Sequence, residues 1–144
     1  MPCPFFEPRS AVPSTRFTGV RLPLIDEYSG LCHSEAGENT IAVDTAHLLQ
    51  CNHGYASGLC PRFPPNAPTS ALRYSVSSRT AREITLVWLE EQDHSPIRWG
   101  SLRYSIAEDT VSPLDLTPLI QAQALAFCRS FLLRLRTAEQ PTNV

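Results

Sequence analysis

The pattern of hydrophobic and polar positions changes near residue 70. From there on, apolar residues recur at strand spacing, first over Leu72–Val76 and again over Ile84–Leu89. The second run is apolar on both faces, which is typical of a central strand. A third run covers Ile97–Ile106, and the Glu91–Pro96 segment before it has the composition of a hairpin connection. The pattern therefore predicts three antiparallel strands in succession.

The third run contains an irregularity. Its apolar phase shifts between Trp99 and Leu102, and Gly100 lies at the shift. A glycine inside a strand often marks a bulge. We therefore expect Gly100 to interrupt the regular pairing of this strand.

The C-terminal segment 117–137 carries the clearest helical pattern. Thr117 is a good N-cap, and Pro118 occupies the first helical position. Gln121 and Gln123 lie off the apolar face of this helix. That face consists of Ile120, Ala124, Phe127, Cys128, Phe131 and Leu135. We expect the helix to pack with this one face across the sheet.

The first 70 residues hold nine of the thirteen prolines and five of the six glycines, so regular structure should be sparse there. A short helix is expected near Asp44–Gln50, and a loop follows it over Cys51–Pro65. The predicted fold is α+β. A loop-rich lobe over residues 1–68 precedes a three-stranded antiparallel sheet packed against the C-terminal helix over residues 69–144, and the two form one compact unit.

Composition excludes several classes of protein. The chain has 144 residues, of which 42% are hydrophobic and 18% charged, so it is not a disordered polyelectrolyte. A net charge of −2 removes the usual electrostatic basis for duplex binding. No apolar run approaches the roughly 18 residues of a membrane span, and the N-terminus lacks the features of a signal peptide. We therefore expect a cytoplasmic protein without a membrane span.

Four of the five cysteines fall in the first 60 residues, and they carry the candidate chemistry. In a reducing compartment such a group is more typical of metal binding than of disulfides. The intervals of 28, 18 and 8 residues contain no C-x2-C pair of the zinc-finger type and no ferredoxin run. The predicted metal ligands are Cys3, Cys32, Cys51 and Cys60. Cys128 lies on the apolar helix face, where a small buried hydrophobic residue is expected.

Four thiolates suit a [4Fe–4S] cluster and Zn²⁺ equally well in charge and softness. Structural zinc is usually held by two short knuckles, whereas a cuboidal cluster can collect single cysteines from distant loops. Aromatic residues near the ligands, Phe5, Phe6, Tyr55 and Phe63, could shield a cluster from solvent. The leading hypothesis is a small [4Fe–4S] protein with a structural, redox-sensing or electron-transfer role, and the alternative is a zinc-stabilised, non-catalytic interaction module.

Two histidines lie beside predicted ligands. Either His53 or His33 could replace one thiolate, although a loop histidine next to a ligand is more often a supporting donor or exposed. The sequence assigns no catalytic residue, so an enzyme is not expected. The partner implied by the leading hypothesis is an unidentified protein or redox partner.

Binding of single-stranded nucleic acid is a further alternative. The predicted strands interleave cations with aromatic rings, which can stack bases. However, strand alternation places adjacent residues on opposite faces, and the helix is expected to cover the aromatic side. The residues concerned are Arg73, Tyr74, Arg98, Trp99, Arg103 and Tyr104. The negative net charge also disfavours this reading.

The Cys51–Pro64 segment, together with Cys3-Pro4-Phe5-Phe6, resembles an uncharacterised family of small bacterial cysteine-rich proteins. The Trp99–Tyr104 strand resembles that family less closely. No activity is assigned to the family. The resemblance therefore implies joint use of the cysteines and nothing about a substrate.

Overall fold

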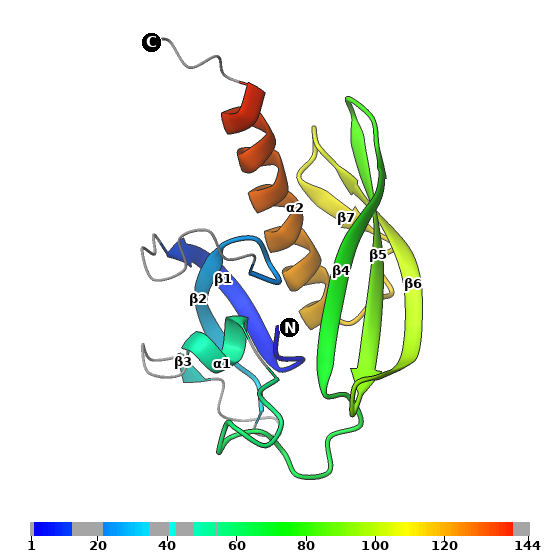
Figure 1. The fold of residues 1–144 in the computed structure, drawn as a ribbon. Helices are drawn as coiled ribbons and strands as arrows, with labels where there is room; N and C mark the ends of the chain where they lie inside the picture. The colour runs from blue at the N-terminus through cyan, green and yellow to red at the C-terminus, as the bar shows by residue number, and fades with distance from the viewer. Residues whose placement is uncertain (1, 13–21, 35–40, 43–47, 54, 140–144) are drawn as a thin grey trace.

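The computed structural model describes residues 2–12, 22–34, 41–42, 48–53 and 55–139. The long helix α2 (Pro118–Glu139) lies between two antiparallel sheets (Figure 1). The small sheet has the order β1-β2-β3, with strands at Phe6–Val12, Glu27–Cys32 and Ile41–Ala42. The large sheet has the order β4-β5-β6-β7, with strands at Ala71–Arg79, Glu83–Gln92, Ser95–Ser105 and Thr110–Ser112. A short helix, α1, spans Leu48–Asn52.

The prediction of a three-stranded sheet is wrong, because the large sheet has four strands. The fourth, β7, pairs with the end of β6 and has only three residues. A strand of that length is too short to show an alternating pattern. Helices combined with antiparallel sheets still give an α+β architecture.

The first half of the chain contains a sheet where the sequence predicted loops. Pro8 is tolerated in β1 because that strand lies at the sheet edge and its register shifts just after Pro8. Gly30 of β2 is required by close approach, since a Cβ there would overlap the carbonyl oxygen of Glu7. The short helix predicted over Asp44–Gln50 is described from Leu48 and continues to Asn52, and residues 43–47 lie outside the described part.

The bulge predicted at Gly100 is also wrong. Gly100 pairs in register with Trp88, and the irregularity between β5 and β6 falls between Glu90 and Glu91. The indole of Trp88 packs directly over Gly100, because a Cβ there would lie 2.9 Å from the ring atom Cζ2. The two-residue turn that joins these strands, Asp93–His94, has positive φ angles of 47° and 67°.

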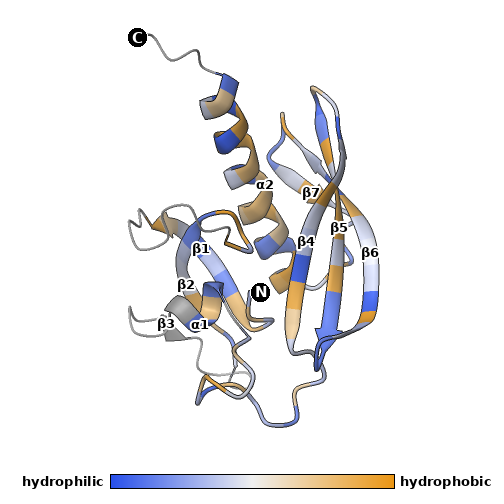
Figure 2. Cartoon of the chain, viewed as in Figure 1, coloured by the Kyte–Doolittle hydropathy of each residue, from blue (hydrophilic) through white to orange (hydrophobic). Residues whose placement is uncertain are grey.

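The start and the apolar face of α2 agree with the sequence pattern. The hydroxyl of Thr117 accepts the N–H of Ile120 at 3.4 Å, as expected of an N-cap. Ile120, Ala124, Phe127 and Cys128 are buried in one core with residues of the large sheet. Figure 2 shows hydrophilic residues toward the C-terminal end of the helix. None of the described helices is long and apolar enough to cross a membrane.

A second face of α2 is buried as well, and the sequence pattern did not predict it. Gln123, Ala126 and Ser130 are buried although only one of them is apolar. The Tyr28 hydroxyl, from β2, donates to the carbonyl oxygen of Ala126 at 2.9 Å and contacts the hydroxyl of Ser130. Asp26 accepts from Arg134 at 2.6 Å further along the helix. The helix therefore joins the two sheets through two different faces.

Gly100→Ala is expected to destabilise the fold by about 1–3 kcal/mol, because the added methyl must displace the packed ring of Trp88. Urea unfolding measures the change. Ser101→Ala, at the next and exposed position of the same strand, is the control and should change stability by less than about 0.5 kcal/mol. Equal stability of the two variants would refute the packing explanation for Gly100.

Candidate metal centre

All four cysteines predicted as ligands line one cavity of about 20 Å³, and we call them the four cavity cysteines: Cys3, Cys32, Cys51 and Cys60. Phe5, Phe6, Ala56 and Phe63 supply most of the apolar wall. The remaining lining residues are Ser34, Gln50 and Arg62. Residues separated by up to 57 positions in the chain thus face the same small space.

Pairing between backbone segments brings three of these cysteines together. Cys3 lies in the turn that precedes β1, and Cys32 ends β2. The antiparallel register sets Phe6 opposite Cys32, which places the Cys3 turn beside the end of β2. The N–H of Cys3 donates to the carbonyl oxygen of Cys51 at 3.0 Å. A direct backbone bond therefore joins two of the cavity cysteines.

A buried side chain holds α1, and with it Cys51, against β2. Asn52 is 1% exposed, and its amide makes both hydrogen bonds that a neighbouring strand would make. Its Oδ1 accepts the N–H of Tyr28 at 2.8 Å, and its Nδ2 donates to the carbonyl oxygen of Tyr28 at 3.0 Å. These bonds offset the cost of burying the amide and fix the residue that follows Cys51.

Cys60 lies between two tight turns. The carbonyl oxygen of Ala56 accepts the N–H groups of Leu59 and Cys60, at 3.0 and 2.8 Å. The carbonyl oxygen of Cys60 in turn accepts the N–H of Phe63 at 3.1 Å. The ring of Phe63 packs edge-to-face on Phe5, with centroids 5.5 Å apart. This contact closes the cavity wall between the Cys60 loop and the Cys3 turn.

Cys3 and Cys51 are buried, whereas Cys32 and Cys60 are half-buried. All five cysteines are free of disulfides. Burial is the main cause that raises the pKa of the Cys3 thiol to about 12. A backbone hydrogen bond at Phe5 opposes the rise, and the neighbouring thiols of Cys51, Cys32 and Cys60 add to it. Within the described residues, no group of three or more His, Cys, Asp or Glu side chains is arranged to hold a metal ion. The arrangement is therefore a cavity lined by thiols, not a formed coordination sphere.

The other candidate ligands lie outside the cavity wall. His53 is exposed, and His33 is half-buried with its Nε2 3.7 Å from a carboxylate oxygen of Glu7. Neither histidine lines the cavity. Cys128 is fully buried in the core between α2 and the large sheet, where burial raises its pKa to about 12. The sequence prediction of a core role for Cys128 agrees with this position.

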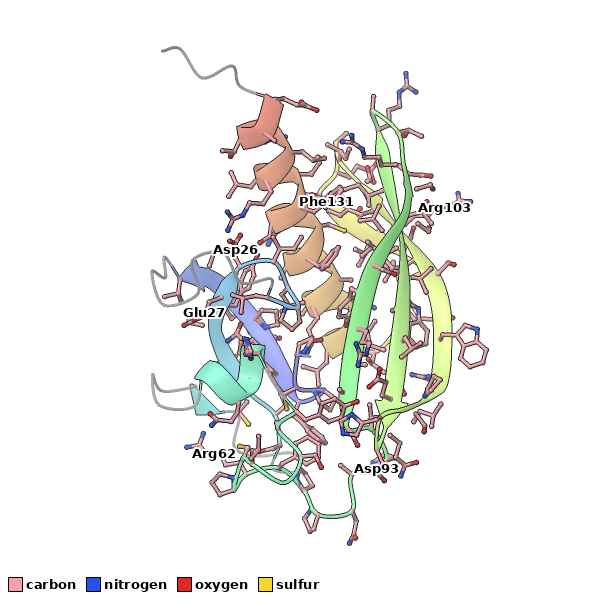
Figure 3. The ribbon with its side chains drawn as sticks, in the orientation of Figure 1. Asp26, Glu27, Arg62, Asp93, Arg103 and Phe131 are labelled. Atoms are coloured by element: carbon pink, nitrogen blue, oxygen red, sulfur yellow. The ribbon has the colours of Figure 1, made fainter. Side chains whose placement is uncertain are left out.

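Arg62 is a lining residue that sequence reasoning did not single out. It follows Cys60 by two positions, and Figure 3 shows it below α1, at that end of the molecule. A guanidinium keeps its positive charge at every physiological pH. Arg62 therefore brings a permanent positive charge to the wall of the cysteine cavity. Its proximity to Cys60 in the sequence was the available signal.

Comparisons with known proteins gave no match. A scan against family models found none, and neither did searches of curated proteins and of solved structures. The chemistry of the cysteine cavity is therefore the basis for a functional assignment.

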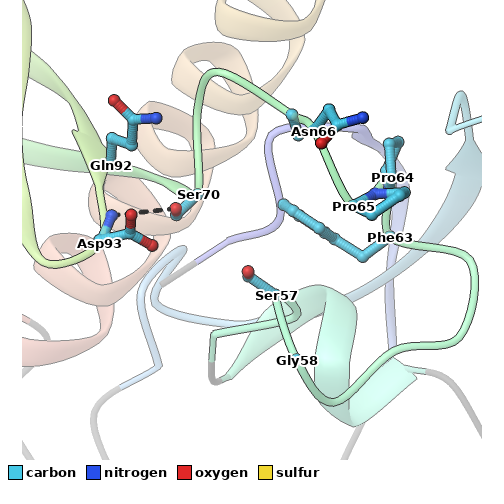
Figure 4. Close-up of a pocket in the computed structure, with 10 residues that line it drawn as sticks. Ser57, Gly58, Phe63, Pro64, Pro65, Asn66, Ser70, Gln92 and Asp93 are labelled. Carbon is cyan, nitrogen blue, oxygen red and sulfur yellow. Dashed lines mark hydrogen bonds between the residues drawn. The ribbon is translucent and has the colours of Figure 1, made fainter.

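A wider cleft of about 560 Å³ lies between the loop that follows Cys60 and the turn between β5 and β6 (Figure 4). Asp93 is the one charged residue among those that line it, and its N–H donates to the hydroxyl of Ser70 at 3.1 Å. Ser57, Asn66 and Gln92 add only neutral polar groups. This lining contains no nucleophile paired with a base, so the cleft offers no evident catalytic chemistry.

The outer face of the large sheet gives limited support for nucleic-acid binding. The helix covers the inner face, and Trp99 remains 63% exposed on the other. The three arginines predicted to reach phosphates are each paired with a glutamate of β5. The pairs are Arg73–Glu91, Arg98–Glu90 at 2.5 Å and Arg103–Glu83 at 3.9 Å. Phosphate would have to compete with these carboxylates.

A buried carboxylate connects the loop before Cys60 to the large sheet. Glu91 is 5% exposed and accepts hydrogen bonds from the Tyr55 hydroxyl and from the Arg73 guanidinium. Burial by itself raises the pKa of Glu91. The hydrogen bonds from Arg73 and Tyr55, with the charge of Arg73, outweigh burial and lower that pKa. Ionised Glu91 therefore stabilises the fold.

Glu91→Gln is expected to cost about 1 kcal/mol at pH 7, a modest value because Arg73 is nearly half exposed. The stability supplied by Glu91 is present above its unfolded pKa, which is about 4.3, and is lost as pH falls through its lower folded pKa. The variant should therefore lose less stability on acidification than the parent, measured by urea unfolding at several pH values. Glu90→Gln, which removes the more exposed pair with Arg98, is the matched control. An unchanged pH profile in Glu91→Gln would contradict this account.

Proposed function

We propose that this chain is a metalloprotein in which Cys3, Cys32, Cys51 and Cys60 hold a [4Fe–4S] cluster. Its role is structural, redox-sensing or electron-carrying. The observation that carries this proposal is the convergence of four cysteines, from four separate segments, on one cavity. Four thiolates are the usual ligand set of such a cluster.

The surroundings of the cavity support a cluster in two ways. The apolar wall of Phe5, Phe6 and Phe63 would limit access of water, which protects sulfide and tunes the reduction potential. The positive charge of Arg62 would offset the excess negative charge that four thiolates bring to a bound cluster. With cysteine at all four corners no iron is left open, so the proposal includes no Lewis-acid catalysis of a substrate.

A single Zn²⁺ ion is the second candidate, and the size of the cavity favours it. About 20 Å³ is room for roughly one water-sized guest between the cysteines. Four thiolates also form a common structural zinc site, which would make the chain a zinc-stabilised interaction module. Either metal requires reduced thiols, so the proposal places the protein in the cytoplasm.

Metal and sulfide analysis of anaerobically purified protein, with a visible spectrum of the same sample, tests the proposal. A cluster should give about four irons and four sulfides per chain, with charge-transfer absorption in the visible range. About one zinc in a colourless protein would support the second candidate instead, since Zn²⁺ has a filled d shell. A folded protein with neither metal would contradict both.

Cys51→Ala and Cys60→Ala should each lose the metal and render the first half of the chain sensitive to protease, because metal binding contributes folding free energy there. Cys128→Ala is the matched control. It should keep the metal and lose only about 1 kcal/mol from a small truncation of the core. Full metal occupancy in both cavity variants, or metal loss in the control, would refute the assignment of ligands.

A further inference from the structure

Gln123 is a polar residue placed in the centre of the structure. It lies on α2 and is 0% exposed. Leaving a buried amide without hydrogen bonds costs about 1–3 kcal/mol. Here Nε2 donates to the carbonyl oxygens of Cys3 and Phe6, both at 2.8 Å, and Oε1 accepts from the Tyr74 hydroxyl at 3.1 Å. The amide is therefore engaged at both ends.

The partners of Gln123 fix the direction in which its amide points. The carbonyl oxygens of Cys3 and Phe6 can only accept, so the NH₂ group must face them. The amide oxygen then faces Tyr74, whose hydroxyl can donate. Tyr74 belongs to β4, so a residue of the large sheet orients a side chain of the helix toward the small sheet.

The two carbonyl groups that Gln123 binds lie at the two ends of the turn that carries Cys3. Within this turn the N–H of Phe6 donates to the carbonyl oxygen of Cys3 at 3.0 Å, around Pro4 and Phe5. The N–H of Cys3 is bonded to Cys51. The turn is therefore bonded to α2 through Gln123 and to α1 through Cys51.

We propose that Gln123 is a positioning residue for Cys3: it holds the Cys3 turn against α2 so that this thiol faces the cavity, and Tyr74 orients it. The proposal rests on the function proposed above, since it treats Cys3 as a metal ligand. It assigns to α2 and β4 a role in the metal centre, although neither contributes a lining residue to the cavity.

The same helix supplies a matched control. Gln121 also donates through Nε2 to two carbonyl oxygens, those of Leu114 at 2.9 Å and Leu116 at 2.7 Å. These acceptors lie in the segment that leads into α2, and none of them lines the cavity. Gln121→Met and Gln123→Met therefore each remove one side-chain amide from the same helix. Only the amide of Gln123 is bonded to Cys3.

The first test measures metal release from the purified holoprotein to a chelator in excess. Loss of a residue that orients a ligand typically costs roughly 10-fold to 100-fold in metal affinity. We expect release from Gln123→Met to be faster by about that factor, Tyr74→Phe to lie between it and the parent, and Gln121→Met to match the parent. Equal release rates for the two Met variants would overturn the proposal.

The second test uses the protein as purified, whatever metal it carries, and reports the accessibility of the Cys3 thiol rather than the release of metal, so it separates the positioning role from the metal proposal. The rates at which iodoacetamide alkylates Cys3 and Cys128 are measured in the same sample by peptide mass spectrometry. Cys128 is 0% exposed in the core between α2 and the large sheet, so its rate reports general unfolding. Gln123→Met should raise the rate of Cys3 relative to that of Cys128, and an equal rise at both would overturn the proposal.

The two tests fail in different ways. If the purified protein carries no metal but Gln123→Met selectively frees Cys3, the metal function is wrong and the positioning role stands. If metal is bound and neither release nor relative alkylation changes, the positioning role is wrong and the metal function stands. If Gln123→Met does not fold, the same two measurements are made on Tyr74→Phe. That variant removes only the hydroxyl that orients the amide.

Discussion

The structure depends on the burial of α2 on two sides. One face is apolar and packs on the large sheet through residues such as Ile120, Ala124 and Phe127. The other face contains Gln123 and Ser130, whose burial is favourable only if hydrogen-bond partners are supplied. The first half of the chain supplies them, through Tyr28 and the turn at Cys3. Neither half can satisfy the helix alone, so the two halves are interlocked.

The cysteine cavity is formed by the same interlocking. Its cysteines belong to loops and element ends, and the aromatic wall packs them against the core. Directional bonds add to this packing: Asn52 holds α1 on β2, Gln123 holds the Cys3 turn on α2, and Tyr55 connects the loop before Cys60 to Glu91 of the large sheet. The C-terminal half therefore supports a cavity to which it gives no lining residue.

The sequence predicted the features that depend on repetition and composition. Periodicity located α2 and three strands of the large sheet, and uneven distribution singled out the four cysteines that share a cavity. It did not predict features that depend on a single close contact. Pro8 and Gly30 suggested a loop, but Pro8 lies in an edge strand and Gly30 lies where two strands approach closely. Gly100 is required because the indole of Trp88 packs against it. Gln123 was overlooked because an apolar pattern cannot reveal a polar residue that is buried with partners.

The central claim is that the four cavity cysteines together hold one metal group. X-ray absorption at the iron and zinc edges of anaerobically purified protein tests it most directly, because it reports the atoms bound to the metal. The account predicts a first shell of sulfur alone, with an additional iron–iron shell for a cluster, or about four sulfurs at roughly 2.3 Å for zinc. A first shell dominated by nitrogen or oxygen, or the absence of bound metal, would contradict it.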